Sequence, residues 1–164
     1  MKNFDWTKFS RKLAIEANIQ SLYDAWIIPA ELERWFLKDA DFTNAEGKSI
    51  SKSQRIKIGD TYKWQWHLWD GTEEGKITKV NGKDHLQFTF AGNCLVDVHF
   101  EIYEKGTIVS IAQSNIPTDD DSKQNIRLGC DNGWSFYIVN LKSVYEGGLD
   151  LRNKDPKLKP MLNN

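Results

Sequence analysis

The strictest alternation of apolar and polar residues in the chain is the stretch Tyr62-Lys63-Trp64-Gln65-Trp66-His67-Leu68. Apolar residues at every second position are typical of a β-strand with one buried and one solvated face. A second informative stretch, Gly133-Trp134, lies in a helical pattern, and only further strands are expected between the two. Antiparallel strands closed by one long helix predict an α+β fold, in which a curved sheet wraps around the helix and leaves room for a hollow.

Turn residues after Leu68 recur at the spacing of hairpins, which predicts four more strands in a meander. The turns are expected at Asp70-Gly71, Asn81-Gly82, Gly92-Asn93 and Lys105-Gly106. The residues predicted to face the interior are Tyr62, Trp64, Trp66, Leu68, Ile77, Leu86, Phe88, Phe90, Val96, Val98, Phe100, Ile102, Val109 and Ile111. The positions between them are mostly polar, so the opposite face is predicted to be solvated.

The chain before this sheet predicts one strand followed by a bent helical arm. The strand is expected over residues 8–15, and Asn18 is a suitable N-cap for a helix over 19–27. Pro29 ends that helix and favours a second short helix that runs to Phe36.

A short strand is expected over residues 40–42, and the polar stretch 43–60 that follows has no clear period. Two alternatives remain for this stretch. It forms an edge strand around residues 53–58, or it is a mobile loop near the mouth of a cavity.

The last helix is predicted from an apolar stripe at steps of three and four residues. Acidic residues 119–121 suit its N-terminus, and Gly147-Gly148 ends it. The stripe consists of Ile126, Cys130, Trp134, Tyr137 or Ile138, Leu141, and Val144 or Tyr145. Gly129 and Gly133 each cost about 1 kcal/mol relative to Ala inside a helix, so we expect a close approach to the sheet or a kink there.

Length and composition exclude several classes of protein. A chain of 164 residues fits one domain, predicted over residues 1–155, with a C-terminal tail over 156–164. With a net charge of −1, the chain lacks the excess of positive charge that is typical of proteins that bind nucleic acid. No apolar run is long enough to span a membrane and no leader is evident, so a cytoplasmic location is expected. Cys94 and Cys130 have neither paired-thiol nor zinc-ligand spacing and are expected to be free thiols.

Several residues, taken in order, resemble a known superfamily over most of the chain, from about Phe9 to Asp155. The matching residues are Ala25, Trp26, Pro29, Glu31, Leu32, Trp35, Gly59, Asp60, Gly75, Ile77, Leu86, Phe88, Phe90, Thr107, Val109, Ile111, Gly133, Trp134, Leu141, Lys142 and Glu146. The chain is thereby similar to the START-like, birch-pollen-allergen-like superfamily (SRPBCC). Within it, the chain most resembles bacterial homologues of the heat-shock protein 90 ATPase activator.

The resemblance implies a helix-grip fold, in which the sheet grips the last helix around a cavity. Proteins of this superfamily bind varied lipids, hormones and polyketides on one scaffold, so the resemblance implies little about the particular ligand. Two parts depart from the pattern. An extension at residues 149–152 is expected to cap one end of the cavity, and the long polar loop before Gly59 leaves its entrance undefined.

Aromatic and apolar residues of the two layers are the candidate ligand-binding residues, since apolar pockets favour rigid rings with a few polar groups. Gln113 and the hydroxyls of Tyr62, Tyr137 or Tyr145 are expected to orient a carbonyl or hydroxyl of the ligand. The set predicted to bind the ligand is Trp35, Tyr62, Trp64, Trp66, Phe88, Phe100, Ile111, Gln113, Trp134, Tyr137 and Leu141. The alternative for each ring is that it fills a solid core, because an empty void of about 300 Å³ would cost roughly 7 kcal/mol.

Catalysis requires titratable groups that face the substrate, and the interior-facing strand positions carry no Asp, Glu, Lys or His. We therefore expect no catalytic residues, no cofactor and no enzyme activity. His67, His85 and His99 are expected on the solvated face, with His67 and His99 near Asp97, as surface histidines without the spacing of a metal site. The predicted function is non-catalytic binding of a small, largely hydrophobic molecule, and the alternative is a protein interaction module such as a chaperone regulator.

Overall fold

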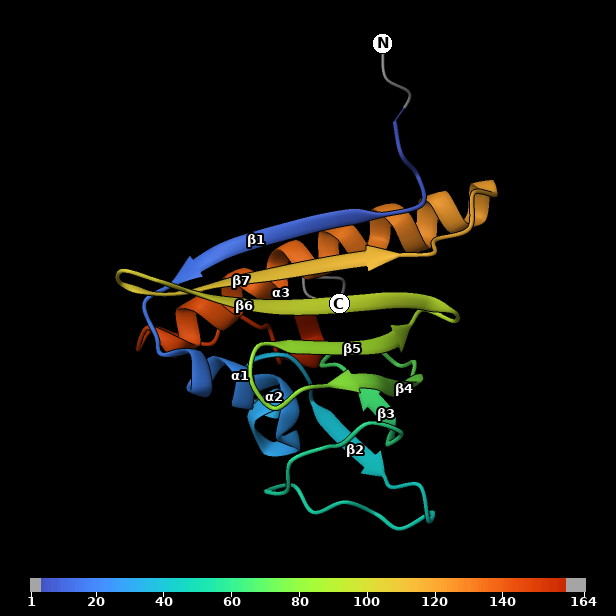
Figure 1. Ribbon diagram of the computed structural model, residues 1–164. Helices are drawn as coiled ribbons and strands as arrows, with labels where there is room; N and C mark the ends of the chain where they lie inside the picture. The colour runs from blue at the N-terminus through green and yellow to red at the C-terminus, as the bar shows by residue number, and fades with distance from the viewer. Residues whose placement is uncertain (1–3, 159–164) are drawn as a thin grey trace.

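The computed structural model describes residues 4–158 and shows seven antiparallel strands in one sheet, in the order β1-β7-β6-β5-β4-β3-β2 (Figure 1). The predicted α+β fold and the five-strand meander are confirmed. The strands are β1 (Phe9–Ile15), β2 (Asp39–Thr43), β3 (Thr61–Gln65), β4 (Glu73–Val80), β5 (His85–Phe90), β6 (Cys94–Tyr103) and β7 (Gly106–Ser114).

A helical arm carries the chain from β1, at one edge of the sheet, to β2 at the other edge. It consists of α1 (Ile19–Ile27) and α2 (Pro29–Trp35). The Asn18 side chain accepts a hydrogen bond from the Ser21 backbone N–H at 2.8 Å, and Pro29 occupies the first position of α2. Both helix starts agree with the prediction from sequence.

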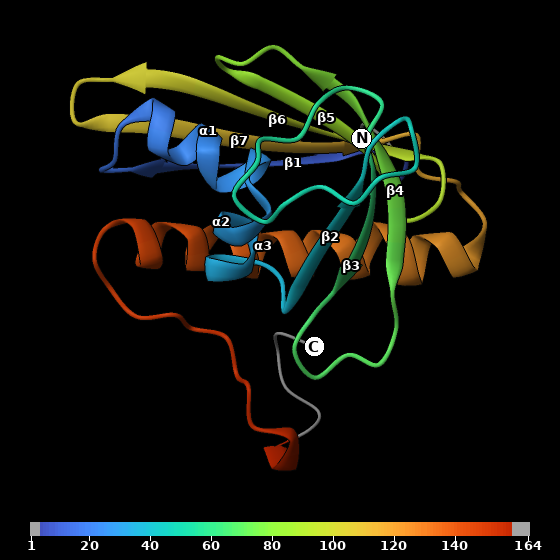
Figure 2. The ribbon, with the colours of Figure 1, turned by 90° about the horizontal axis from the view of Figure 1, so that it is seen from below.

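The long helix α3 (Gly129–Tyr145) follows a π-helical segment, η1 (Ser122–Leu128), and runs along the concave side of the sheet beside β1 (Figure 2). Arg11 of β1 forms an ion pair with Asp131 at 2.6 Å, and Lys142 donates to the Ala14 carbonyl at 3.0 Å. Helix α3 ends where predicted, since Gly147 has the left-handed backbone that terminates helices (φ 81°).

Aromatic rings from both layers fill most of the space between sheet and helices. Phe36 stacks on Trp134 with ring centroids 5.1 Å apart, and Trp64 packs edge-on against Phe88 at 5.3 Å. Strand β4 changes register between Ile77 and Lys79, and such irregularities increase the bend of a strand. The sheet thus curves around a core made largely of rings.

Two details of the predicted strands are wrong. Strand β3 ends at Gln65, because Leu68 has a left-handed backbone (φ 66°) that no β-strand accommodates. Ile102 is 71% exposed, although it was predicted to face the interior. Of the two alternatives left open for the polar stretch, the edge strand does not form, since residues 53–58 lie in a loop.

The loop over residues 44–60 packs against the helical arm. Ile56 is buried and its N–H donates to the Ile27 carbonyl at 2.9 Å. The Lys52 carbonyl accepts from Ala30 N–H at 2.8 Å, and its ammonium lies 2.6 Å from the Glu33 carboxylate. These contacts hold the loop over the junction of α1 and α2.

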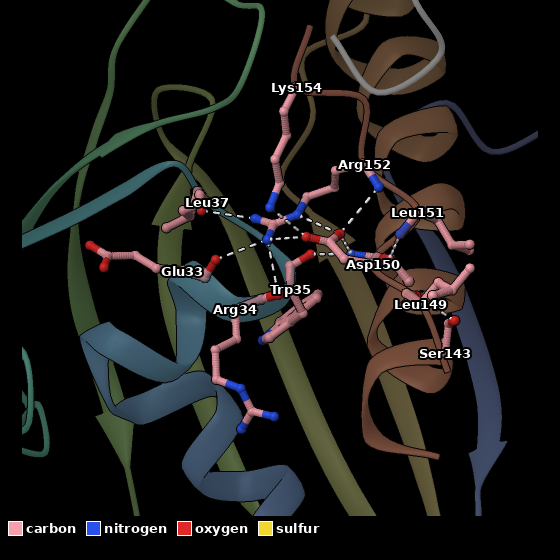
Figure 3. Close-up of polar contacts among 11 residues, drawn as sticks. Glu33, Arg34, Trp35, Leu37, Ser143, Leu149, Asp150, Leu151, Arg152 and Lys154 are labelled. Atoms are coloured by element: carbon pink, nitrogen blue, oxygen red, sulfur yellow. Dashed lines mark hydrogen bonds and ion pairs between the residues drawn. The ribbon is translucent and has the colours of Figure 1, made fainter. Parts of the chain in front are cut away.

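The extension at residues 149–152 connects α3 to the end of α2 through the buried side chain of Arg152 (Figure 3). Its guanidinium donates to three backbone carbonyls of the α2 end, those of Glu33, Arg34 and Leu37, at 2.8–2.9 Å. The same group pairs with Asp150 at 2.7 Å. The last carbonyls of a helix have no partners within the helix, so Arg152 stabilises the end of α2.

The chain then continues past the predicted domain boundary into a short 3₁₀ turn, η2 (Pro156–Leu158). The remainder of the predicted tail, residues 159–164, lies outside the described residues, and the boundary after residue 155 stays a prediction.

Candidate functional site

A hollow of about 360 Å³ lies between the first half of α3 and the end of the sheet formed by β3, β4 and β5. It is open to solvent on one side, where Trp69 is 42% exposed. We call it the aromatic groove. Its lining consists of Phe36, Trp66, Trp69, Glu73, Phe90, Ala91, Asn125, Gly129, Cys130, Gly133, Trp134 and Tyr137.

The walls of the aromatic groove are rings held in place by other rings. Tyr137 packs edge-on against Phe36 at 4.9 Å, and Phe90 lies 5.2 Å from Trp134. At the open side, Trp66 and Trp69 meet edge to face at 5.4 Å. Rings that are already packed lose little freedom when a ligand binds, so the walls are preorganised.

Two glycines of the last helix open the groove. A Cβ built on Gly133 would meet no atom within 4 Å, and one on Gly129 would meet only the Gln124 carbonyl at 3.8 Å. The close approach to the sheet that we expected at these residues is therefore absent. Gly129 begins α3 directly after the π-helical segment, and such segments are frequent at functional sites.

Glu73, the first residue of β4, is the one carboxylate among the described residues that lines the aromatic groove. One of its oxygens accepts a hydrogen bond from the Ala91 N–H at 2.6 Å, and burial raises the pKa of the carboxyl group. The expectation of no interior acid or base is thus wrong. Glu73 lies four residues before Ile77 and therefore faces the same side of β4, so the alternation itself contained the signal.

The other titratable groups of the groove are less easily ionised than usual. Burial raises the pKa of the Cys130 thiol to about 11, and burial also raises the pKa of the Tyr137 hydroxyl. An activated nucleophile has a lowered pKa or an adjacent base, and neither group meets the first condition.

The predicted ligand-binding residues divide into two sets. Trp66, Trp134 and Tyr137 line the aromatic groove. The other eight are buried and do not line it: Trp35, Tyr62, Trp64, Phe88, Phe100, Ile111, Gln113 and Leu141. The structure also brings Phe36, Phe90 and Trp69 to the groove, and of these only Trp69, in the loop between β3 and β4, had no signal in the sequence.

Three of the polar groups predicted to orient a ligand have protein partners, although the buried amide nitrogen of Gln113 has none among the described residues. Gln113 is fully buried and its side-chain oxygen accepts from the Trp134 indole N–H at 3.0 Å. The Tyr62 hydroxyl donates to the Thr89 carbonyl at 2.5 Å, and the Tyr145 hydroxyl donates to Glu31 at 2.6 Å. Gln113 therefore orients a ring of the groove wall.

The segments expected to shape the entrance lie elsewhere. No residue of 44–60 or of 149–152 lines the aromatic groove. The extension lies behind its wall, where the charges of Arg152 and Asp150 act on the Tyr137 hydroxyl. Residues 149–152 thus join α2 to α3 and do not cap the groove.

The comparison with family models matches residues 16–146 to the family described as Activator of Hsp90 ATPase homolog 1-like protein. The chain belongs to this family. A comparison with curated proteins gives no match. No described helix of the chain is both long and apolar enough to cross a membrane.

Solved structures similar to this family member share its fold. A protein from Staphylococcus saprophyticus is 20% identical with a TM-score of 0.69, over 88% of this chain and 96% of that one. The Aha1 dimer from Colwellia psychrerythraea is 20% identical with a TM-score of 0.68, over 86% and 97%. A protein in the dynemicin biosynthetic locus is 16% identical with a TM-score of 0.67, over 90% of this chain but 50% of that one.

Proposed function

We propose that this protein binds a small, largely apolar molecule in the aromatic groove without transforming it. The observation that carries the proposal is a hollow of about 360 Å³ lined by six aromatic side chains at a place where two helix glycines leave space. Sites for small molecules are concave and mostly apolar with a few polar groups, and the groove has this character.

Glu73 gives the proposed ligand one polar requirement. Its carboxylate lines a groove that is otherwise mostly apolar, and it already accepts one hydrogen bond from Ala91. A guest that carries a hydrogen-bond donor or a positive charge gains a partner there, and aromatic rings also favour a cation. We therefore infer an aromatic or alicyclic guest with one donor or basic group.

Binding without catalysis is supported by the groups that line the groove. Cys130, whose pKa is raised to about 11, stays a neutral thiol near pH 7 and is a poor nucleophile. Of the described lining residues, Glu73 alone supplies a carboxylic acid or base, whereas most general acid–base reactions at neutral pH use a second positioned group.

Gly133→Leu is expected to abolish guest binding while the protein stays folded. The leucine side chain would project into open space in the groove, and replacing a helix glycine adds up to about 1 kcal/mol of stability. Native mass spectrometry of the purified protein would detect the bound guest, and displacement of the uncharged dye Nile red would measure its affinity. The affinity for the guest should fall at least about tenfold.

Asn132→Leu is the matched control, because Asn132 is exposed on the same helix and does not line the groove. It should bind the guest as the wild type does. Equal guest retention by the Gly133 and Asn132 variants would contradict the proposal.

Glu73→Gln is expected to weaken binding of basic guests and to leave neutral ones unaffected. The amide keeps the shape and the oxygen that accepts from Ala91 but loses the charge, and a hydrogen bond to a charged group contributes about 1.5–3 kcal/mol. Isothermal titration with an aromatic primary amine, which is protonated at pH 7, and its uncharged analogue separates the two cases. An equal loss for both probes would argue that Glu73 only shapes the groove.

The alternative function, regulation of a chaperone by protein interaction, is favoured by the family to which the chain belongs. Its test is the ATPase rate of an Hsp90-type chaperone with and without this protein. Stimulation that Gly133→Leu leaves unchanged would support a surface-based function, and no stimulation or binding would count against it.

A further inference from the structure

Two histidines and an aspartate meet on the solvated face of the sheet, on the side opposite the aromatic groove. His85 of β5 lies directly across from His99 of β6, and Asp97 precedes His99 by two residues on the same face. One potential ligand atom of each lies within 4.8 Å of the others. The His85 Nε2 and an Asp97 oxygen are 2.7 Å apart, and the two imidazole rings stack at 4.0 Å.

Neighbouring side chains fix the orientation of this cluster. The Gln87 amide donates to both oxygens of Asp97, at 2.9 and 3.0 Å, and the Thr78 hydroxyl donates to the Gln87 oxygen at 2.9 Å. The Asn81 side chain accepts from the backbone N–H of His85 at 3.0 Å and so holds the start of β5. Second-layer hydrogen bonds of this kind orient ligands in metal sites.

The plain alternative is a His85–Asp97 ion pair with a second ring stacked on it. Such a pair does not require Asp97 to be held by Gln87 on both oxygens, nor a second imidazole at the position directly opposite the first. The side chains of His85 and Asp97 are 20% and 23% exposed, so an ion from solvent can reach them.

We propose that His85, Asp97 and His99 form a binding site for one divalent transition-metal ion of the zinc type, with water in the remaining position. Two imidazole nitrogens and one carboxylate oxygen are the donor set of open zinc and related sites, whereas calcium and magnesium select oxygen ligands. Ligand atoms about 2.0–2.2 Å from an ion must lie closer together than 4.8 Å, so the stacked rings turn towards Asp97 when the ion binds.

Zinc chloride added to chelator-treated full-length protein tests the site. We expect saturable binding of one ion, shifts of the His85 and His99 imidazole resonances in NMR spectra, and a higher melting temperature. Magnesium chloride at the same concentration should produce none of these changes.

His99→Ala is the decisive variant, since His99 is the exposed member of the cluster and its loss should leave the fold intact. Zinc affinity should fall at least about tenfold, and Gln87→Met should lower it about 10- to 100-fold by releasing Asp97. His67→Ala is the control, because His67 lies outside the cluster, and it should bind zinc as the wild type does.

Unsaturable binding, equal zinc affinity of the wild type and His99→Ala, or loss of binding in His67→Ala would each overturn the proposal. Because the site lies on the other face of the sheet, Gly133→Leu should leave zinc affinity unchanged. Failure of the groove proposal and failure of the metal proposal are therefore distinguishable.

Discussion

Arg152→Ala is expected to lower the free energy of unfolding by about 3–5 kcal/mol, the usual cost of removing one partner of a buried ion pair. The side chain is 1% exposed and forms the ion pair with Asp150. Its loss would leave three carbonyls at the end of α2, those of Glu33, Arg34 and Leu37, without their donor. Urea-induced unfolding followed by tryptophan fluorescence measures the effect.

Arg34→Ala is the control for this prediction. Arg34 is in the same region, but its side chain is 53% exposed and its ion pair is with Glu31 on the same helix. Exposed ion pairs contribute about 0–1 kcal/mol, so this variant should differ little from the wild type. Similar losses in the two variants would refute the assigned role of Arg152.

The same contact predicts a dependence of stability on pH. Partial burial raises the pKa of Asp150, but hydrogen bonds from Arg152 and Lys154 outweigh it and hold the pKa well below its usual range. A lowered pKa in the folded state contributes stability above the unfolded value of about 3.9, and this stability is lost as the pH falls towards the lowered value. As the pH falls below about 4, the free energy of unfolding should therefore decrease less for Arg152→Ala than for the wild type.

Trp134→Ala is expected to cost about 3–5 kcal/mol of unfolding free energy and to weaken guest binding as well. Trp134 is 2% exposed, stacks on Phe36 and packs against Phe90. Its indole N–H is the partner of the Gln113 oxygen, so the substitution also leaves a buried acceptor unpaired. Chemical denaturation and Nile red titration of the same sample give both effects.

Trp69→Ala separates the contribution of the groove rings to guest binding from their contribution to stability. Trp69 also lines the groove but is 42% exposed. Its removal should therefore lower the free energy of unfolding by less than about 1 kcal/mol and still weaken guest binding. Comparable destabilisation by the Trp134 and Trp69 variants would contradict this prediction and show that Trp69 is also part of the structural core.

The sequence predicted the architecture because local signals and burial pointed to the same elements. Asn18 and Pro29 gave the starts of α1 and α2, and the alternation around Trp64 gave the buried face of β3. The sequence could not predict which of the interior rings line the aromatic groove and which are packed in the core. Trp64 and Trp66 have the same phase, yet only Trp66 is at the end of the curved sheet, where the packing stops.

The sequence predicted that His85 and His99 share the solvated face, but not that they are paired, because the turn between β5 and β6 differs from the predicted one. A two-residue turn at Gly92-Asn93 would have placed His85 opposite Phe100, whereas the structure has three residues between Phe90 and Cys94. Ala91 and Gly92 both have left-handed backbones (φ 49° and 82°), which three-residue turns accommodate. One extra loop residue shifts the register by one position and brings His85 against His99.

The order of strands has a consequence for how the chain acquires its shape. Phe9 of β1 lies opposite Gln113 of β7, so the first strand stays without a partner until almost the whole sheet has been synthesised. Contacts this distant along a chain slow folding, and an unpaired edge is a target for association with other chains. On the ribosome, therefore, β1 is the segment most in need of protection, and its docking is expected to be among the last steps of folding.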